Sequence, residues 1–191
     1  MTGDLGTDDA QVHAQAREVL DFWFGLSKEA QFRRDDALDR TIADRFGRLN
    51  HDLLAGEAAG WHDDPDTMLA AIIVLDQFSR NLHRGQAQAF AADALAVGLT
   101  LEAIERGYDR AMPPARRVFL YMPLMHAEDE ALQDKSVATF EALGIEENAA
   151  FARDHRAVFG RFGRFPGRNA ALGRDTTPEE QAYLAETGGG W

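Results

Sequence analysis

Apolar residues recur at spacings of three and four along most of this chain, and stretches that alternate apolar with polar residues are nearly absent. The clearest stretch repeats in this way at Leu38, Ile42, Phe46, Leu49 and Leu53. This spacing matches the period of an amphipathic α-helix, in which 3.6 residues make one turn. The pattern therefore predicts an all-α protein.

Start and stop signals divide the chain into about eight helices. Starts are indicated by Thr7 as a cap, by Asp64-Pro65, by Pro113-Pro114 and by a capping box at Thr177, and glycines mark most ends. The expected helices cover residues 8–24, 38–55, 64–85, 90–106, 113–130, 131–143 and 146–162, with a short last helix after Thr177. Pro123 lies inside the fifth helix and predicts a kink or an early stop there.

Short connections between these helices predict a compact antiparallel array that forms one domain over residues 1–191. Residues of about 1–7 and 187–191, including the Gly-rich end, are expected to be mobile. No self-similar period is visible, so periodicity alone does not predict a repeat fold.

Charge and composition exclude several classes of function. The net charge is −12 and the sequence pI is about 4.8, which argues against a nucleic-acid partner because phosphate backbones need a basic surface. The chain has no cysteine, which excludes disulfides, zinc-thiolate sites and cysteine nucleophiles. It shows no signal peptide, and no apolar run approaches the roughly 18–20 residues that span a bilayer. We therefore expect a cytoplasmic protein without a membrane partner; its oligomeric state stays open.

The stretch "LDQFSRNLHRG" (residues 75–85) continues a strongly apolar helix into a polar one. Asp76 and Arg80 share a face with apolar residues at spacings of three and four, and Arg84 continues that line if the helix lasts. Gln77 and Asn81 stack one turn apart beside it. Because apolar residues surround much of this helix, Asp76 and Arg80 are expected at the rim of a buried surface, either paired or bound to a ligand.

A second polar group is "HRAVFGRFGRFPGRN" (residues 155–169), which lies in a segment rich in arginine. Arginine presents a planar fork of donors that suits carboxylate and phosphate oxygens. Candidate ligand-binding residues in this group are Arg161, Arg164, Arg168 and Asn169. The alternative is that its phenylalanines belong to the core and its arginines pair with the many acids of the chain.

Two histidines and an acid complete the candidates. His126 and His155 both lie on apolar helical faces, and Glu128 follows His126 closely. Either histidine could act as a general base, although a single histidine on such a face is more often a hydrogen-bonded core residue. No paired metal-ligand signature, phosphate-binding loop or dinucleotide fingerprint is present, so neither a metal nor a cofactor is expected.

These motifs together resemble a bacterial family known as domain of unknown function 924. The resemblance extends from "VLDFWFG" through "LDQFSRNLHRG" and "FLYMPLMHAEDEALQ" to "RFGRFPGRN" and "LGRDTTPEEQAYL". It implies a compact all-α fold similar to tetratricopeptide-like helical arrays, and no established activity. The chain departs from the motifs of the family at three positions. Ser79 stands in place of a proline, Ala127 in place of a serine and Gly167 in place of a histidine. An activity that used this histidine would therefore be lost here or would use His155 or His126 instead.

Three functions remain open. The first is a binding domain whose pocket holds a small anionic molecule or an acidic or C-terminal peptide group, through Gln77, Arg80, Asn81, Arg84, Arg161, Arg164, Arg168 and Asn169. The second is a hydrolase or transferase on an anionic small molecule, with Asp76 or His155 as general base and His126 and Glu128 as further catalytic candidates. The third is a purely architectural polar core in a protein-interaction scaffold. Whether the protein is an enzyme is left undecided.

Overall fold

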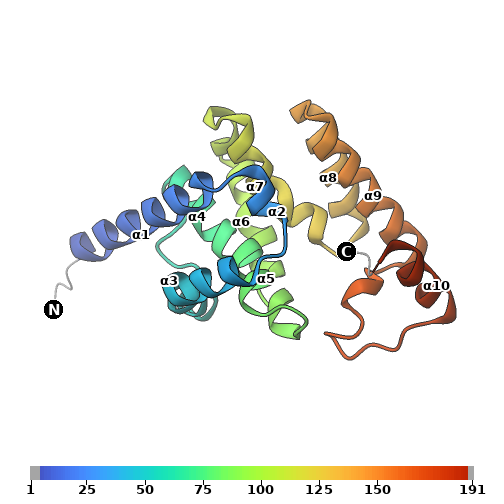
Figure 1. Ribbon diagram of the computed structural model, residues 1–191. Helices are drawn as coiled ribbons and strands as arrows, with labels where there is room; N and C mark the ends of the chain where they lie inside the picture. Colours follow the sequence, from blue (N-terminus) through green and yellow to red (C-terminus); the bar gives the residue numbers. More distant parts are fainter. Residues whose placement is uncertain (1–4, 189–191) are drawn as a thin grey trace.

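A computed structural model describes residues 5–188, and these residues form helices and loops without a β-strand (Figure 1). The predicted all-α class is confirmed. The α-helices are α1 (Leu5–Gly25), α2 (Lys28–Phe32), α3 (Asp36–Ala55), α4 (Pro65–Ile73), α5 (Ser79–Leu82), α6 (Asp93–Glu105), α7 (Pro114–His126), α8 (Glu130–Leu143), α9 (Glu146–Phe162) and α10 (Pro178–Thr187). A π-helical turn, η1 (Val74–Phe78), joins α4 to α5, and short 3₁₀ turns are η2 (Ala87–Phe90), η3 (Tyr108–Ala111) and η4 (Pro166–Arg168).

Several helix ends lie where the local signals place them. The Asp64 side chain accepts hydrogen bonds from the backbone N–H groups of Asp66 and Thr67, with Pro65 in the first turn. Thr177 and Glu180 form the predicted capping box at the start of α10. Each cap satisfies backbone donors that have no partner within the helix. Local chemistry therefore sets these boundaries.

Other boundaries correct the expectations. Helix α1 begins at Leu5 rather than after a cap at Thr7. Of the two ends that were expected to be mobile, residues 1–4 and 189–191 lie outside the described residues. The short helix α2, capped by Ser27, was not expected. Helix α7 continues through Pro123 and ends at His126, so the early stop at Pro123 is wrong.

Helix α4 lies at the centre of the fold, with every residue from Thr67 to Ile73 buried. The aromatic side chains around its continuation come from three other helices. Phe78 lies 5.0 Å from Phe46 of α3 and 5.5 Å from Trp23 of α1, measured between ring centroids, and Trp23 lies 5.4 Å from Phe119 of α7. Aromatic burial of this kind dominates core stability, and it fixes the segment that carries Asp76.

Helices that follow one another pack together at the C-terminal end. Helix α7 packs on α8, and α8 on α9, across connections of two or three residues, as expected for antiparallel neighbours. In Figure 1 the helices α8, α9 and α10 form one side of the molecule, while α1 and α3 lie on the other. The tetratricopeptide-like arrangement of these helices stays a prediction.

One stretch, Ala87–Glu105, is long and apolar enough to cross a membrane by length and composition alone. This corrects the expectation that no run approaches that length. Helix α6, which forms most of the stretch, packs on α4 and α7, and core helices of this kind satisfy the same criterion.

Candidate functional site

The polar residues of "LDQFSRN" begin in the π-helical turn η1, where the helical backbone is locally widened. The side chain of Asn50 on α3 donates one hydrogen bond of 2.9 Å to the carbonyl oxygen of Val74 and another of 2.9 Å to the hydroxyl of Ser79. Val74 is the first residue of the turn, and Ser79 directly follows it. Isolated π turns are uncommon and occur often at functional sites. Here the turn presents Asp76 and Gln77 toward α7.

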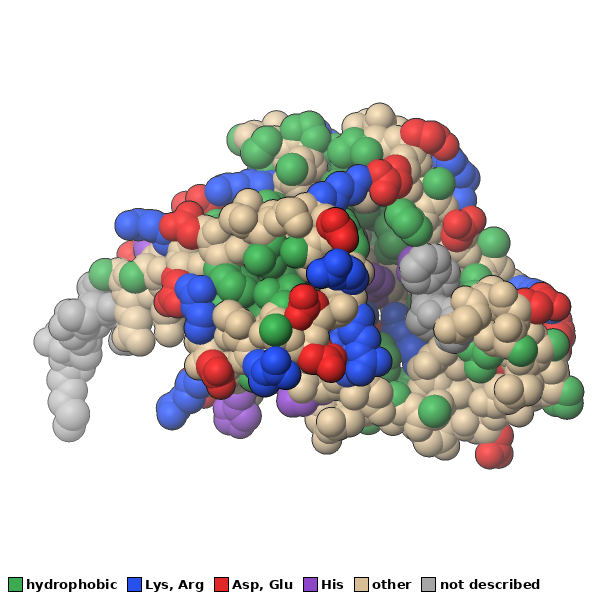
Figure 2. All heavy atoms as spheres, in the orientation of Figure 1, with side chains coloured by type: hydrophobic (Ala, Val, Ile, Leu, Met, Phe, Trp, Pro, Cys, Tyr) green, Lys and Arg blue, Asp and Glu red, His purple; other side chains and the backbone are tan. Residues whose placement is uncertain are grey.

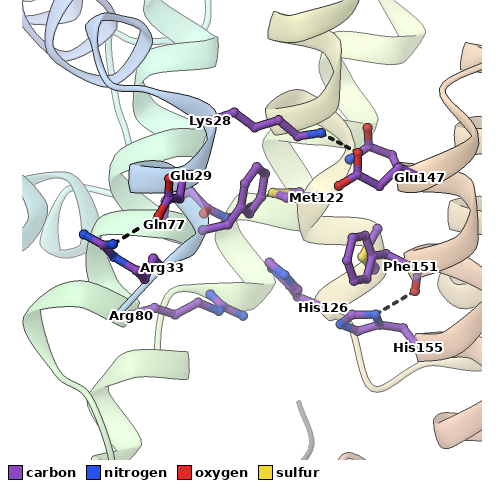
Figure 3. Close-up of a pocket in the computed structure, with 13 residues that line it drawn as sticks. Lys28, Glu29, Arg33, Gln77, Arg80, Met122, His126, Glu147, Phe151 and His155 are labelled. Atoms are coloured by element: carbon purple, nitrogen blue, oxygen red, sulfur yellow. Dashed lines mark hydrogen bonds and ion pairs between the residues drawn. The ribbon is translucent and has the colours of Figure 1, made fainter. Parts of the chain in front are cut away.

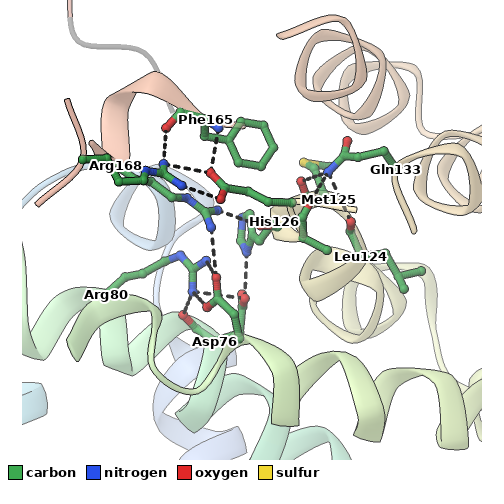
Figure 4. Close-up of polar contacts among 12 residues, drawn as sticks. Asp76, Arg80, Leu124, Met125, His126, Gln133, Phe165 and Arg168 are labelled. Carbon is green, nitrogen blue, oxygen red and sulfur yellow. Dashed lines mark hydrogen bonds and ion pairs between the residues drawn. The ribbon is translucent and has the colours of Figure 1, made fainter. Parts of the chain in front are cut away.

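Asp76 is a buried carboxylate with several donors around it. Its exposed fraction is 1%, and its Oδ1 lies 2.7 Å from Nδ1 of His126 on α7 (Figure 4). Nη1 of Arg80 lies 3.2 Å from the same oxygen and also donates to the backbone carbonyl of Asp76 at 2.7 Å. The amide of Gln77 donates to the second carboxylate oxygen. The predicted Asp76–Arg80 pair is therefore confirmed, at the edge of the core.

The surroundings determine the charge states of Asp76 and His126. Burial alone would raise the pKa of Asp76, but His126, Arg80 and Gln77 together hold it well below its usual range. Burial lowers the pKa of His126 below its ordinary value, against the opposing effect of Asp76. At neutral pH Asp76 is ionised and His126 is neutral. His126 therefore donates through Nδ1, and its Nε2 carries the lone pair.

A second carboxylate, Asp93 at the start of α6, joins the two polar groups that the sequence presents separately. Arg80 donates to both oxygens of Asp93, at 3.0 and 3.2 Å. Arg168 of η4 donates to Oδ2 of Asp93 at 3.1 Å and to the backbone carbonyl of His126 at 2.7 Å. Burial and the nearby charge of Arg80 lower the pKa of Arg168 to about 10, so it remains charged at neutral pH. The two arginines and two carboxylates carry no net charge.

A cavity of about 690 Å³ lies beside this network, with α2 on one side and α9 on the other. Figure 2 shows the surface hollowed between these parts of the molecule, with charged side chains around the opening and a histidine inside. Gln77, Arg80 and His126 lie along one side of the cavity, as Figure 3 shows. The other lining residues are Lys28, Glu29, Phe32, Arg33, Met122, Met125, Glu147, Asn148, Phe151 and His155.

His155 lies on the α9 side of the cavity. Its ring centroid is 6.1 Å from that of His126, and its Nδ1 donates to the carbonyl oxygen of Phe151 at 2.8 Å. Burial, reinforced by His126 and Arg168, lowers the pKa of His155 to about 3. His155 and Asp76 do not contact each other through a described hydrogen bond; His126 lies next to both.

The expectation that five arginines converge on one pocket is wrong, because among them only Arg80 lines the cavity. The helix ends at Leu82, so Arg84 no longer follows the face of Arg80. Instead, Arg84 and Asn81 both bind Asp39 of α3, where Arg84 Nη2 lies 2.8 Å and Asn81 Nδ2 2.7 Å from Oδ1. Asn81 of α5 and Arg84 just beyond it therefore attach this segment to α3.

Arg161 in the last turn of α9 and Arg164 just after it hold the C-terminal segment together. Arg161 pairs with Glu179 at 2.9 Å, and Arg164 donates to both oxygens of Glu180 at 2.7 and 2.9 Å. Asn169 is buried and also donates to Glu180, at 3.2 Å. These contacts explain why α10 is attached to the preceding loop, and they leave Arg161, Arg164 and Asn169 outside the cavity lining.

Glu128, a candidate catalytic residue, holds the loop after α9 in place through contacts with Phe165 and Arg174. It accepts a hydrogen bond from the backbone N–H of Phe165 at 2.7 Å and pairs with both terminal nitrogens of Arg174, at 2.7 and 3.0 Å. Burial opposes these contacts, but Arg174 and Phe165 outweigh it and lower the pKa of Glu128. A carboxylate held in this way is a poor general base. Within residues 5–188, no three His, Asp or Glu side chains are grouped so as to hold a metal ion.

Comparison with known proteins gives a family for this fold and site. The family model described as "Bacterial protein of unknown function (DUF924)" matches residues 19–188. The chain belongs to the DUF924 family. A solved structure of a protein of unknown function from Agrobacterium tumefaciens is similar, with 40% identity and a TM-score of 0.88, over 92% of this chain and 99% of the other. No curated protein matches this chain.

Two of the three departures from the DUF924 motifs lie beside the site network. Ser79 accepts the hydrogen bond from Asn50 just after the π turn, and the carbonyl of Ala127 accepts one from Gln133 at 2.7 Å. Gly167 is exposed in η4, next to Arg168. The buried contacts around His126 are therefore made in this chain with alanine at 127 and glycine at 167.

Two parts of the site in this DUF924 protein are not among the residues predicted from the sequence. One is Asp93, although an acid in the first turn of a helix is a favourable signal at a helix start. Lys28, Glu29 and Phe32 of α2, and Arg33 directly after it, lie in a segment where no helix was expected. The signal available for α2 was Ser27, whose hydroxyl accepts from the N–H of Ala30 at 3.2 Å.

Proposed function

We propose that this protein binds a small organic anion in the cavity between α2 and α9. The observation that carries the proposal is that Arg80 lines the cavity beside His126 while its charge is held in place by Asp76 and Asp93. A guanidinium fixed in this way is preorganised, so little conformational freedom is lost when a carboxylate or phosphate oxygen binds. The volume of about 690 Å³ lies within the range of small-molecule sites.

The test is a thermal-shift screen of carboxylates, phosphates and sulfonates against wild type, Arg80→Gln and Arg84→Gln. Arg84 is a matched control because it also pairs with an aspartate and lies on the same segment, outside the cavity lining. A ligand at a hundred times its dissociation constant adds about 2.7 kcal/mol, or roughly 5–10 °C for a chain of this size.

We expect the ligand-induced shift to be lost in Arg80→Gln and retained in Arg84→Gln. Equal shifts in the two variants would place the anion elsewhere. No shift with any anion, together with strong destabilisation of both variants, would favour the architectural alternative.

A second candidate function is hydrolysis, and the contact between Asp76 and His126 favours it. In this proposal His126 replaces Asp76 and His155 as the general base. The strongly lowered pKa of Asp76 makes it a weak base, and a pKa of about 3 makes His155 a weak base as well. Nε2 of His126 would remove a proton from the attacking water and return it to the leaving group. Loss of turnover in His126→Gln, across a panel of esters and phosphate esters, is the expected result.

A further inference from the structure

Within residues 5–188, every charged side chain that lines the cavity has an opposite partner. Lys28 pairs with Glu147 across the opening, Arg33 pairs with Glu29 at 3.0 Å, and Arg80 pairs with Asp76 and Asp93. An anion that enters therefore adds a negative charge to a balanced site. An uncompensated charge beside the largely buried side chains of Asp76 and His126 is costly, so we expect a cation or a proton to accompany the anion.

His126 is the group in a position to take up that proton. Its Nδ1–H is committed to Asp76, and no described residue hydrogen-bonds its Nε2, on a ring that lines the cavity. A protonated His126 would have an ionised carboxylate on one side at 2.7 Å and the bound anion on the other. Both contacts favour the charged imidazole, in the way that a buried carboxylate stabilises a catalytic imidazolium.

The charged and titratable groups that face His126 come from each element packed around it. They are Asp76 and Arg80 on η1 and α5, Asp93 on α6, His155 on α9 and Arg168 on η4. Two are negative, two are positive, and His155 is neutral because burial lowers its pKa to about 3. His126 is therefore the group in this set whose protonation would balance an added anion at neutral pH.

The remainder of the wall indicates what the anion is attached to. Phe32, Met122 and Met125 line the cavity, and Phe32 leaves 49% of its surface exposed on α2. Covering an apolar chain or ring with such a wall removes apolar surface from water, which favours binding. Methionine adapts to ligands of varied shape.

We infer that the ligand is a monocarboxylic acid with an apolar tail, and that it binds together with one proton, which His126 holds between Asp76 and the carboxylate. This inference rests on the proposed function and deepens it. The carboxylate lies beside Arg80 and the tail lies along Phe32, Met122 and Met125. Binding should weaken about tenfold for each unit of pH above neutrality, for as long as the proton is taken up on binding.

The test is calorimetric titration of the full chain with octanoate near pH 8, in Tris and in triethanolamine, two cationic buffers with different ionisation enthalpies. The difference in heat gives the number of protons taken up. We expect about one proton for each octanoate bound, falling to none in His126→Gln and unchanged in His51→Gln. His51 is an exposed imidazole on α3 and serves as the matched control.

Selective ¹⁵N labelling of histidine in the wild-type protein provides a second readout that does not depend on a variant folding. Addition of octanoate should move the Nε2 resonance of His126 from the position of a bare ring nitrogen to that of a protonated one. Octanol, which has the same tail without the anion, should bind far more weakly and take up no proton.

The outcomes separate the two proposals. Binding of octanoate without proton uptake, or equal binding of octanol, would overturn the inference and leave anion binding intact. Binding of inorganic phosphate or octyl phosphate but not octanoate would also overturn it. If no carboxylate, phosphate or sulfonate binds at any pH, the proposed function itself fails.

Discussion

Arg168 donates a hydrogen bond of 2.7 Å to the backbone carbonyl oxygen of His126. The loop after α9 therefore holds the end of α7, where the cavity histidine lies. Because Arg168 is also bound to Asp93, movement of this loop would disturb both the position of His126 and the charge balance around Arg80. This connection makes the loop part of the site, although it does not line the cavity.

Replacement of Arg168 by glutamine should therefore affect stability and binding together. It leaves Asp93, whose side chain is 17% exposed, with Arg80 as its remaining partner, and breaking a largely buried ion pair costs about 3 kcal/mol. Urea unfolding at neutral pH should show a loss of this size, and anion affinity should fall as well. Arg161→Gln is the control, since the Arg161–Glu179 pair is half-exposed and such pairs contribute about 0–1 kcal/mol. Similar losses in the two variants would contradict the role assigned to Arg168.

Acid should destabilise the fold through His155. Its folded-state pKa of about 3 lies below the ordinary value of 6.5, so below pH 6.5 the unfolded chain binds a proton that the folded chain does not. The contribution of neutral His155 to the free energy of unfolding is therefore fully present above pH 6.5 and is lost as the pH falls toward 3. Between pH 7 and pH 4 the loss from this group is roughly 3 kcal/mol.

Between pH 7 and pH 4, His155→Gln should therefore lose roughly 3 kcal/mol less unfolding free energy than the wild type. Urea midpoints at pH 7 and pH 4 measure the difference. His51→Gln, at an exposed position, should keep the wild-type acid sensitivity. If His155→Gln retained it as well, the acid response would have to come from other groups.

Asn50 should be among the polar residues most sensitive to substitution. It is 4% exposed and satisfies the carbonyl of Val74 and the hydroxyl of Ser79. In Asn50→Leu both groups would remain buried without this partner, at about 1–3 kcal/mol for each unsatisfied group. We expect a lower unfolding midpoint and, by hydrogen exchange, faster opening of residues 74–82. Unchanged exchange there would show that the π turn does not depend on α3.

The ion pair between Lys28 and Glu147 should matter little for stability. Its side chains are 61% and 57% exposed, and exposed pairs of this kind contribute about 0–1 kcal/mol. Lys28→Met should leave the unfolding free energy within about 0.5 kcal/mol while weakening anion binding severalfold, since a cation at the opening is removed. A matched change at the same rim, Arg33→Met, should behave in the same way. A large loss of stability in either variant would show that the pair holds α2 in place.

The helices were predictable because their signals are local. Caps such as Asp64 and Thr177 and spacings of three and four residues depend on neighbours within one turn, and the structure follows them to within a few residues. The central position of the segment that carries Asp76 was also predictable, because few polar residues interrupt it. The Asp76–Arg80 contact follows from the same spacing.

The composition of the cavity was not predictable in the same way. Arg84 pairs with Asp39 and Arg164 pairs with Glu180 because of how the helices pack. In a sequence, an arginine that binds a ligand cannot be told from one that pairs with an acid of the same protein. His126 and Asp76 are fifty positions apart, so their contact appears only once α7 lies against η1. The π turn itself has no sequence signature that we can identify.

That turn restricts the length of the chain as well as its shape. A π turn holds one residue more than the α-helical turn that it replaces, and Asn50 binds both its first residue and the residue after it. Deletion of one residue between Val74 and Phe78 would let the segment close into regular α-helix, and Asp76 and Gln77 would no longer both keep the directions in which they meet His126 and Met122. The region can accept changes of side chain far more easily than a change in the number of its residues, and gaps in this stretch should be absent from sequences that keep the same site.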